Sequence, residues 1–226
     1  MMQVTEKLDI IKQNIEAACS RSGRSADDVK VIAVTKYVSS ERAAEAVQAG
    51  VRRLGENRDD GLLGKWEHIG DRAEWHFIGT LQTRKVKNIV DKVDYIHSLD
   101  RLSLAREISK RTARPMHCFV QVNIAGEESK HGLAPEDTVK FIKQLEDYPN
   151  IIVDGLMTMA PHTDDESVLR TCFRGLRILR SQIQDMHLDY APCTELSMGM
   201  SNDYAIAVEE GATFVRIGSA LVGSEL

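Results

Sequence analysis

The sequence predicts an α/β fold: a single-domain (β/α)8 barrel of the TIM type with an extra helix before the first strand. Three observations predict it. Short apolar runs alternate strictly with amphipathic segments, eight such units fit within 226 residues, and polar residues stand where the apolar runs end. Strict alternation favours parallel strands, and eight units of this size fit a compact closed barrel. A doubly wound open sheet is the alternative.

The first half of the chain begins with an amphipathic helix over residues 5–19, in which Leu8, Ile11 and Ile15 recur at helical spacing. Gly23 ends this helix, which we expect to plug or flank the bottom of the barrel. Strands are predicted where apolar or β-branched residues run together between turn residues. They are residues 30–36, 53–57, 74–78 and 95–98, and the helices after them are 41–49, 59–68, 82–90 and 101–111.

The second half repeats this alternation. Pro115 separates one helix from the next apolar run, and Pro135 occupies the first turn of another helix, where proline is tolerated. The predicted strands are residues 118–123, 153–158, 195–198 and 213–217. The helices are residues 135–146, 166–186 and a segment from Ser201 to about 210, with a last short helix beginning near Gly218. No linker or internal repeat divides the chain, so residues 1–226 are expected to form one domain.

The composition excludes several classes of protein. Hydrophobic residues make up 42% and charged residues 28%, with a formal net charge of −5, which is typical of a globular protein with a buried core. A nucleic-acid-binding surface needs a basic patch, and none is evident. No apolar run approaches the length of a membrane span, and the N-terminus lacks the pattern of a signal peptide. These features indicate a cytoplasmic protein without a nucleic-acid or membrane partner.

The cysteines and histidines do not suggest a disulfide framework or a metal site. Cys19, Cys118, Cys172 and Cys193 are far apart and form no C-x-x-C pair, so they are interpreted as reduced, buried thiols. The seven histidines show no metal-ligand spacing. We therefore expect no metal ion.

Lys36 is the first candidate site residue. The five residues from Val31 to Thr35 are apolar or β-branched, which is typical of a strand buried on both faces, and they deliver a lysine to its C-terminal end. A lysine amine in such a place is suited to Schiff-base chemistry with a carbonyl. A lysine that simply points into water is the alternative, and the rest of the chain decides between them.

In a TIM barrel the chemistry lies at the C-terminal ends of the strands. The residues at these predicted ends are mostly polar, which favours a site for a small polar ligand: Lys36, Asn57, His76, Ser98, Asn123, Met157, Ser197 and Arg216.

Two glycine-serine segments resemble a grip on a phosphate. Ser197, Met198, Gly199 and Ser201 lie in a segment that leads into a helix, where Ser201 has the position of an N-cap. Residues 216–219 end the last strand, and there Gly218 allows close approach of the backbone and Ser219 adds a hydroxyl. The loops after strands seven and eight are the usual phosphate site of this fold. The segments could also be ordinary turns, but their joint position favours a phosphate.

A lysine for an aldehyde and two segments for a phosphate match pyridoxal 5′-phosphate (PLP). PLP also needs a partner for its pyridine nitrogen, and Arg216 is the candidate. Because arginine stays protonated, it would leave the ring nitrogen unprotonated and the ring a weak electron sink. Such a site suits holding the cofactor, or racemisation, better than decarboxylation or transamination.

At these residues the sequence resembles the pyridoxal phosphate homeostasis proteins, which are single-domain relatives of the alanine racemase N-terminal barrel. The matching motifs span nearly the whole chain: AVTK ending on Lys36, GENR at 55–58, WHFIG at 75–79, IHSLD at 96–100, LSMGMSND at 196–203 and VRIGSALVG at 215–223.

The resemblance implies a (β/α)8 barrel that carries PLP on Lys36 as a Schiff base. It places Arg216 near the pyridine nitrogen, Ser201, Gly218 and Ser219 at the phosphate, and Asn57, His76 and Ser197 along the ring. It implies a carrier or buffer of PLP that affects vitamin B6 and amino-acid balance and hands the cofactor to PLP-dependent apo-enzymes.

Two enzyme classes are the alternatives. An amino-acid racemase of the related fold uses a second domain and a tyrosine base from a partner subunit; this chain ends at Leu226, so His76 or water would have to supply the second base. A Schiff-base aldolase would need a carboxylate near Lys36. Glu56 is the candidate, but its side chain alternates with that of Asn57 and points elsewhere. The lack of the racemase dimer contact favours a monomer.

Three residues, Arg84, Lys130 and His131, have no assigned role. Arg84 stands where the family often has asparagine, and it is expected to face solvent or strengthen a positive rim. Lys130 and His131 lie in a loop that matches a family loop, where a second PLP-handling lysine is conceivable and a solvated one is the simpler interpretation.

Overall fold

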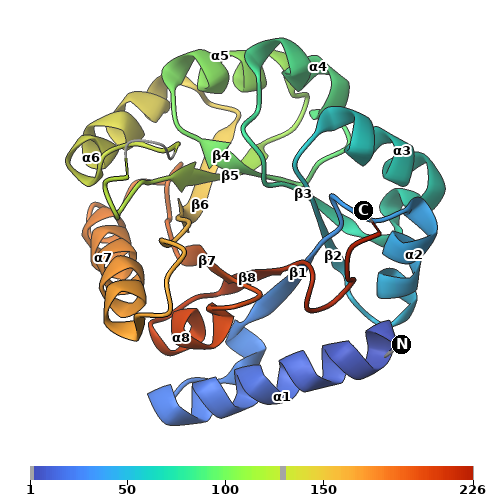
Figure 1. Ribbon diagram of the computed structural model, residues 1–226. Coiled ribbons are helices and arrows are strands. Elements are labelled where there is room, and N and C mark those ends of the chain that lie inside the picture. Colours follow the sequence, from blue (N-terminus) through green and yellow to red (C-terminus); the bar gives the residue numbers. More distant parts are fainter. Residues whose placement is uncertain (1–2, 128–130, 226) are drawn as a thin grey trace.

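The computed structural model describes residues 3–127 and 131–225 and contains a closed barrel of eight parallel strands surrounded by helices (Figure 1). Every strand pairs with its neighbour in the sequence, and β1 pairs with β8 to close the barrel. The open doubly wound sheet is therefore excluded. The strands are β1 Lys30–Val34, β2 Arg53–Glu56, β3 Glu74–Phe77, β4 Tyr95–Leu99, β5 Met116–Gln121, β6 Ile151–Met157, β7 Glu195–Met200 and β8 Phe214–Ile217.

The helices lie where the sequence predicts them, with some differences in length. They are α1 Val4–Ser22, α2 Ser40–Gln48, α3 Asp59–Ile69, α4 Val86–Ile89, α5 Leu102–Arg111, α6 Pro135–Gln144, α7 Glu166–Gln184 and α8 Tyr204–Glu209. The helix expected over residues 82–90 is a 3-10 turn, Thr83–Lys85, followed by the short α4. The last helix expected near Gly218 is a turn, in which the amides of Leu221 and Val222 both donate to the Gly218 carbonyl.

Helix α1 flanks the barrel and does not plug its bottom. It packs against α8 and α2, on the side of the barrel formed by β1 and β8 (Figure 1). Its apolar face is buried there, and Asn14 donates to the Tyr204 hydroxyl of α8 at 2.8 Å. In a (β/α)8 barrel the helix after the eighth strand would cover this side. Since β8 is followed by a turn, α1 covers it instead.

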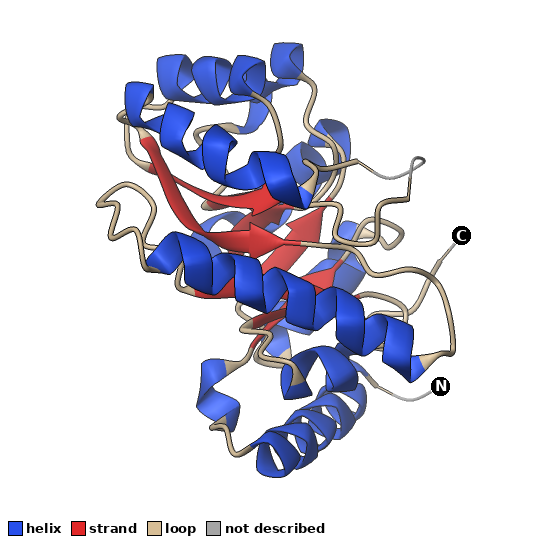
Figure 2. Ribbon diagram, turned by 90° about the vertical axis from the view of Figure 1, so that its left-hand side faces the viewer, coloured by secondary structure: helices blue, strands red, loops and turns tan. Residues whose placement is uncertain are grey.

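The core has two parts, one on each face of the strands. Strand β1 shows the reason: Ile32 and Ala33 are both fully buried, but Ile32 lies in the barrel interior and Ala33 lies between strands and helices. The interior cluster joins Ile32 to Phe119, Met157 and Phe214. All strands point to the same side, where the C-terminus lies (Figure 2). That side is the C-terminal mouth of the barrel, and the opposite side is the N-terminal mouth.

Candidate functional site

A cavity of about 530 Å³ opens at the C-terminal mouth. Its lining comes from the ends of several strands and from the loops after β6, β7 and β8. The residues that line it are Val34, Lys36, Tyr37, Asn57, Ile78, Gly79, Thr80, Gln121, Met159, Ala160, Pro161, His162, Met200, Ser201, Asn202, Asp203, Arg216, Gly218, Ser219, Gly223 and Ser224. The cavity thus brings together six of the ten residues that the sequence singled out: Lys36, Asn57, Ser201, Arg216, Gly218 and Ser219.

Lys36 lies on a turn two residues beyond the end of β1. The turn is closed by a hydrogen bond from the Val38 amide to the Thr35 carbonyl, 3.1 Å long. The Lys36 Nζ lies 4.7 Å from the centre of the Tyr37 ring. Among the described residues no carboxylate lies within ion-pair distance of this amine. A lysine held by an aromatic face alone is available to a ligand in the cavity.

Arg216 contributes a buried cation. Only 4% of the residue is exposed, on β8. Its Nη1 donates to the Ser197 Oγ at 2.7 Å and its Nη2 to the Thr158 carbonyl at 2.9 Å. Burial lowers its pKa to about 10, against the opposing effect of Asp203, so the guanidinium stays charged at neutral pH. These bonds use two of its five N–H donors, and Arg216 also lines the cavity.

The two glycine-serine segments meet at the rim. The Gly218 amide donates to the Ser201 Oγ at 3.2 Å, which ties the loop after β7 to the turn after β8. Ser219 lies beside them on the exposed rim. The sequence predicted that Ser201 is the N-cap of the following helix, and that prediction is wrong. Asp203 is the residue before α8, and the Met200 amide donates to its Oδ1 at 2.5 Å.

Four predicted site residues do not line the cavity. Ser197 and His76 are fully buried in the barrel interior and do not line the cavity, so their place along a ligand ring stays a prediction. Met198 is buried in the outer core. Gly199 has φ +90°, and a Cβ there would meet the Cβ of Ala207 at 2.5 Å. Glycine at this position lets α8 pack closely on β7.

Asn57 owes its place to a close backbone contact. A Cβ on Gly79 would lie 2.3 Å from the Asn57 carbonyl oxygen, so only glycine lets the ends of β2 and β3 approach this closely. Glu56, one residue earlier, points the other way. It accepts a hydrogen bond from Thr35 Oγ1 at 2.6 Å and pairs with Lys65 at 3.0 Å. That carboxylate is therefore engaged outside the cavity, as the alternation along the strand predicts.

Sequence reasoning missed several parts of the lining. The loop of residues 159–162 follows β6, so the barrel rule alone would have included it. Asp203 is a carboxyl whose pKa burial raises, although hydrogen bonding to the Met200 amide and attraction to Arg216 oppose the shift. Residues 223–224 come from the end of the chain, where the Glu225 amide donates to the Tyr37 carbonyl at 3.2 Å. No local pattern signals that contact.

The remaining sequence-based expectations concern the loops and the exclusions. Arg84 is exposed and donates to the Gln82 side chain at 3.0 Å. Lys130 lies outside the described residues, while the His131 carbonyl accepts from Gln121 Nε2 at 3.1 Å. Across residues 3–127 and 131–225, no three His, Cys, Asp or Glu side chains gather as metal ligands would. In the same residues no helix combines the length and apolarity that crossing a bilayer needs.

The chain is similar to proteins of one family. Residues 7–225 match the family model of the alanine racemase N-terminal domain. A pyridoxal phosphate homeostasis protein of Aquifex aeolicus is 42% identical over 98% of each chain, and one of Pseudomonas aeruginosa is 36% identical over 99% of this chain and 96% of its own.

Solved structures agree with these sequence matches. PipY of Synechococcus elongatus, solved with PLP bound, is 31% identical with a TM-score of 0.83, over 98% of this chain and all of its own. Alanine racemase of Clostridium difficile is 15% identical with a TM-score of 0.76, over 97% of this chain and 56% of its own, which supports the barrel fold alone.

Proposed function

Because the chain belongs to the pyridoxal phosphate homeostasis protein family, we propose that it binds PLP at the C-terminal mouth and holds it as a Schiff base on Lys36. It serves intracellular PLP and amino-acid homeostasis as a carrier or buffer rather than as a catalyst. The observation that carries the proposal is the joining of Lys36, Arg216 and the 201–219 rim in one cavity. The PLP-bound relative of the same fold supports it.

The donor set fits the groups of PLP. PLP supplies an aldehyde, a phosphate and a pyridine ring that can act as an electron sink. Lys36 Nζ is the nucleophile for the aldehyde carbon, and the aldehyde oxygen leaves as water. The hydroxyls of Ser201 and Ser219 would hold the phosphate at the rim, beside Gly218, whose amide donates to Ser201 Oγ. Asn57, which lines the same cavity, would contact the ring.

Arg216 sets the character of the site. A charged guanidinium donates to an unprotonated ring nitrogen and repels a proton there. The ring is then a weak electron sink, which favours storage over amino-acid chemistry. PLP-dependent apo-enzymes are the proposed recipients, the cytoplasm is the proposed location, and a monomeric single domain is the proposed form.

The enzyme alternatives gain no support from the described residues. His76 is fully buried below the cavity and is not placed to exchange a proton with a ligand there. Glu56, the candidate acid–base group of an aldolase, is paired with Lys65. An assay of amino-acid racemisation on the PLP-loaded protein tests the first alternative, and the proposal expects no turnover above that of free PLP.

The absorption spectrum of the protein with PLP, before and after borohydride reduction, tests the proposal. We expect a visible band that borohydride removes, with the reduced adduct mapped by mass spectrometry to Lys36. An adduct on another lysine would move the anchor elsewhere. Absence of any band with excess PLP would reject the proposed cofactor.

A further inference from the structure

A line of hydrogen bonds crosses the barrel interior beneath the cavity. From Arg216 Nη1 it reaches Ser197 Oγ at 2.7 Å, and from Ser197 Oγ it reaches His97 Nδ1 at 2.9 Å. His97 Nε2 lies 2.8 Å from His76 Nδ1, and His76 Nε2 lies 2.9 Å from Glu74 Oε1. Five side chains from β8, β7, β4 and β3 thus link the cavity to the opposite mouth. We call this set the interior chain.

The two ends of the interior chain fix its direction. A guanidinium only donates hydrogen bonds, and an ionised carboxylate only accepts them. Glu74, whose pKa is lowered by His76 and Arg53 despite its partial burial, only accepts, so a neutral His76 carries its proton on Nε2 and donates to it. His76 Nδ1 must then accept from His97 Nε2–H. His97 Nδ1 in turn accepts from the Ser197 hydroxyl, which itself accepts from Arg216. Each link has one donor and one acceptor, and no other arrangement of neutral imidazoles satisfies all four.

The surroundings hold both imidazoles in place. His76 stacks on Tyr95 with ring centres 4.7 Å apart and planes 5° from parallel, and His97 stacks on Phe119 at 4.3 Å and 20°. Stacking fixes the ring planes while the ring edges make the hydrogen bonds. Burial lowers the pKa of both histidines, most strongly that of His97. The imidazoles therefore stay neutral.

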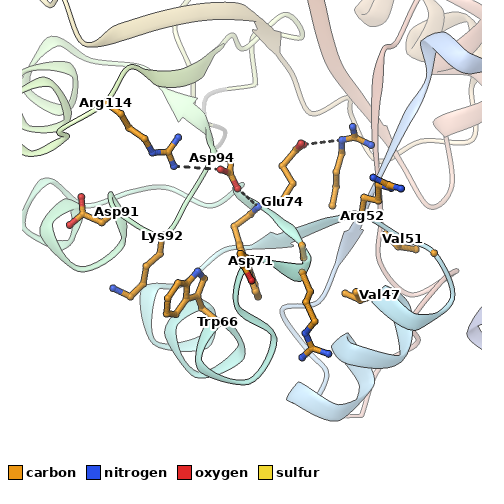
Figure 3. Close-up of a pocket in the computed structure, with 15 residues that line it drawn as sticks. Val47, Val51, Arg52, Trp66, Asp71, Glu74, Asp91, Lys92, Asp94 and Arg114 are labelled. Carbon is orange, nitrogen blue, oxygen red and sulfur yellow. Dashed lines mark hydrogen bonds and ion pairs between the residues drawn. The ribbon is translucent and has the colours of Figure 1, made fainter.

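The far end of the interior chain is open to solvent. Glu74 lines a cavity of about 830 Å³ at the N-terminal mouth, between α2, α3 and the strand starts (Figure 3). Its Oε1 also lies 2.9 Å from Arg53 Nε. The charged or titratable groups around Glu74 are Arg53 from β2, His76 from its own strand and Tyr95 from β4. Asp94, just before β4, lines the same cavity and acts on His76.

We propose that Ser197, His97 and His76 are positioning residues that aim the Arg216 guanidinium into the cavity and connect it electrostatically to Glu74 at the opposite mouth. The role toward a cofactor ring rests on the proposed function; the direction of the interior chain does not. Neutral side chains that are hydrogen-bonded in series between a cation and an anion polarise one another, which strengthens each hydrogen bond. Changes at Glu74 are then felt at Arg216, across the barrel.

The direction of the interior chain is tested without cofactor. Nitrogen-15 NMR of the imidazoles should show His76 and His97 as neutral Nε2–H tautomers between pH 5.5 and 8. In Glu74→Gln the end group offers both a donor and an acceptor, so the Nδ1–H form of His76 should appear. An Nδ1–H tautomer on either histidine in the native protein would overturn the proposal.

The effect on Arg216 is tested by PLP titration of two serine variants. Ser197→Ala removes the hydroxyl that accepts from Arg216 and should weaken PLP binding about tenfold, since hydrogen bonds to charged groups are the stronger kind. Ser98→Ala is the matched control. Ser98 stands at a predicted strand end but does not line the cavity, it is as buried as Ser197, and its Oγ has no hydrogen-bond partner, so the affinity of this variant should be native. Equal affinities in the two variants would overturn the positioning role.

The two tests separate this proposal from the proposed function. If the native protein binds no PLP, the proposed function fails, and the tautomers still decide whether the interior chain has the stated direction. If PLP binds and Ser197→Ala does not unfold at a lower temperature than Ser98→Ala, a loss of affinity reports orientation of Arg216 and not general damage. A native affinity for PLP with the wrong tautomers rejects the interior chain alone.

Discussion

Strand β1 carries a lysine at each end, and the two lysines differ in one respect. Lys30 begins the strand at the N-terminal mouth, with its Nζ 4.5 Å from the Phe214 ring centre and 2.7 Å from Glu195 Oε1. Lys36 follows the strand at the C-terminal mouth, 4.7 Å from the Tyr37 ring centre. Each ammonium has an aromatic ring, but within the described part of the chain only Lys30 also has a carboxylate.

The same difference extends around the barrel. Six strands contribute ionisable side chains to the N-terminal mouth. They form the ion pairs Lys30–Glu195 and Arg53–Glu74 and a hydrogen bond between His117 Nδ1 and Asp154 Oδ2. Each mouth holds a cavity, but the one at the C-terminal mouth is lined by Lys36 and Arg216 together with hydroxyls and the carboxyl of Asp203. Pairing satisfies charges for stability, while groups left without a paired charge are available for a ligand. Among the described residues the N-terminal mouth thus pairs Lys30 with a carboxylate, whereas the C-terminal mouth leaves Lys36 without one.

The largest expected effect is at Lys36. Lys36→Ala removes the nucleophile, so borohydride should trap no PLP on the protein. Its thermal unfolding should stay native, because Lys36 makes no ion pair with the described residues. Mass spectrometry and a thermal scan check both. A reduced PLP adduct that persists in Lys36→Ala, or a large fall in its unfolding temperature, would contradict the proposed difference between Lys36 and Lys30.

The interior between the two mouths should give the protein a pH-dependent stability. Burial lowers the pKa of His97 well below its ordinary 6.5, and it outweighs the hydrogen bond to Glu74 in lowering that of His76. The folded state then binds fewer protons than the unfolded chain. Stability is full above about pH 6.5 and is lost as pH falls toward the lowered pKa values, by at most about 1.4 kcal/mol per pH unit for each histidine.

Urea unfolding at pH 7.5, 6.5 and 5.5 measures this slope. In His97→Gln one of the two groups is gone, so the curve should be flatter even though the variant is less stable. The exposed His68, changed to Gln, is the matched control, because its imidazole lies outside the interior chain. Parallel curves for the native protein and His97→Gln would show that His97 does not titrate as its burial requires.

The barrel and half of its site follow from local sequence patterns. Apolar runs predict the strands, and parallel strands bring their C-terminal ends to one mouth, so Lys36, Asn57 and Arg216 are predicted to meet. The depth of each side chain along the barrel axis is not predicted in this way. It depends on the register between neighbouring strands, such as the shifted pairing of β7 with β8, which no single strand encodes. Ser197 and His76 therefore face inward as expected but lie below the cavity.

The contacts that sequence reasoning missed entirely are long-range. His97 stands mid-strand, 100 residues from Ser197, and nothing in its neighbours shows that the two hydrogen-bond. Helix α1 is recognisable from its periodicity, but its position beside β1 depends on the turn that follows β8. The end of the chain lies along the Lys36 turn through backbone hydrogen bonding, which leaves no residue pattern.

A smaller effect is expected at Lys30. Lys30→Met keeps the aliphatic stem and leaves Glu195 unpaired at the N-terminal mouth. The side chains are 31% and 23% exposed, so the loss should be about 1 kcal/mol, or roughly 3 °C in Tm for a chain of this size. PLP trapping should stay native. Adding Glu195→Gln should restore part of the stability, since the unpaired charge is removed. A double variant that loses more unfolding free energy than the two single variants together would contradict the pairing.

The smallest effect is expected at Tyr37, the ring that corresponds to Phe214 at the other end of β1. The Tyr37 ring attracts the Lys36 ammonium, and the residue is 49% exposed, so the attraction is worth about 0.5 kcal/mol. The neutral amine, which is the form that attacks an aldehyde, lacks that attraction, because a cation–π contact needs the ammonium. Tyr37→Leu should therefore bind PLP about twofold more tightly, and Tyr37→Phe, which keeps the ring, should match the native protein in a fluorescence titration. Weaker binding in Tyr37→Leu with native binding in Tyr37→Phe would mean that the ring contacts the cofactor itself, and the two lysines would then differ in the use of their rings as well as in their charges.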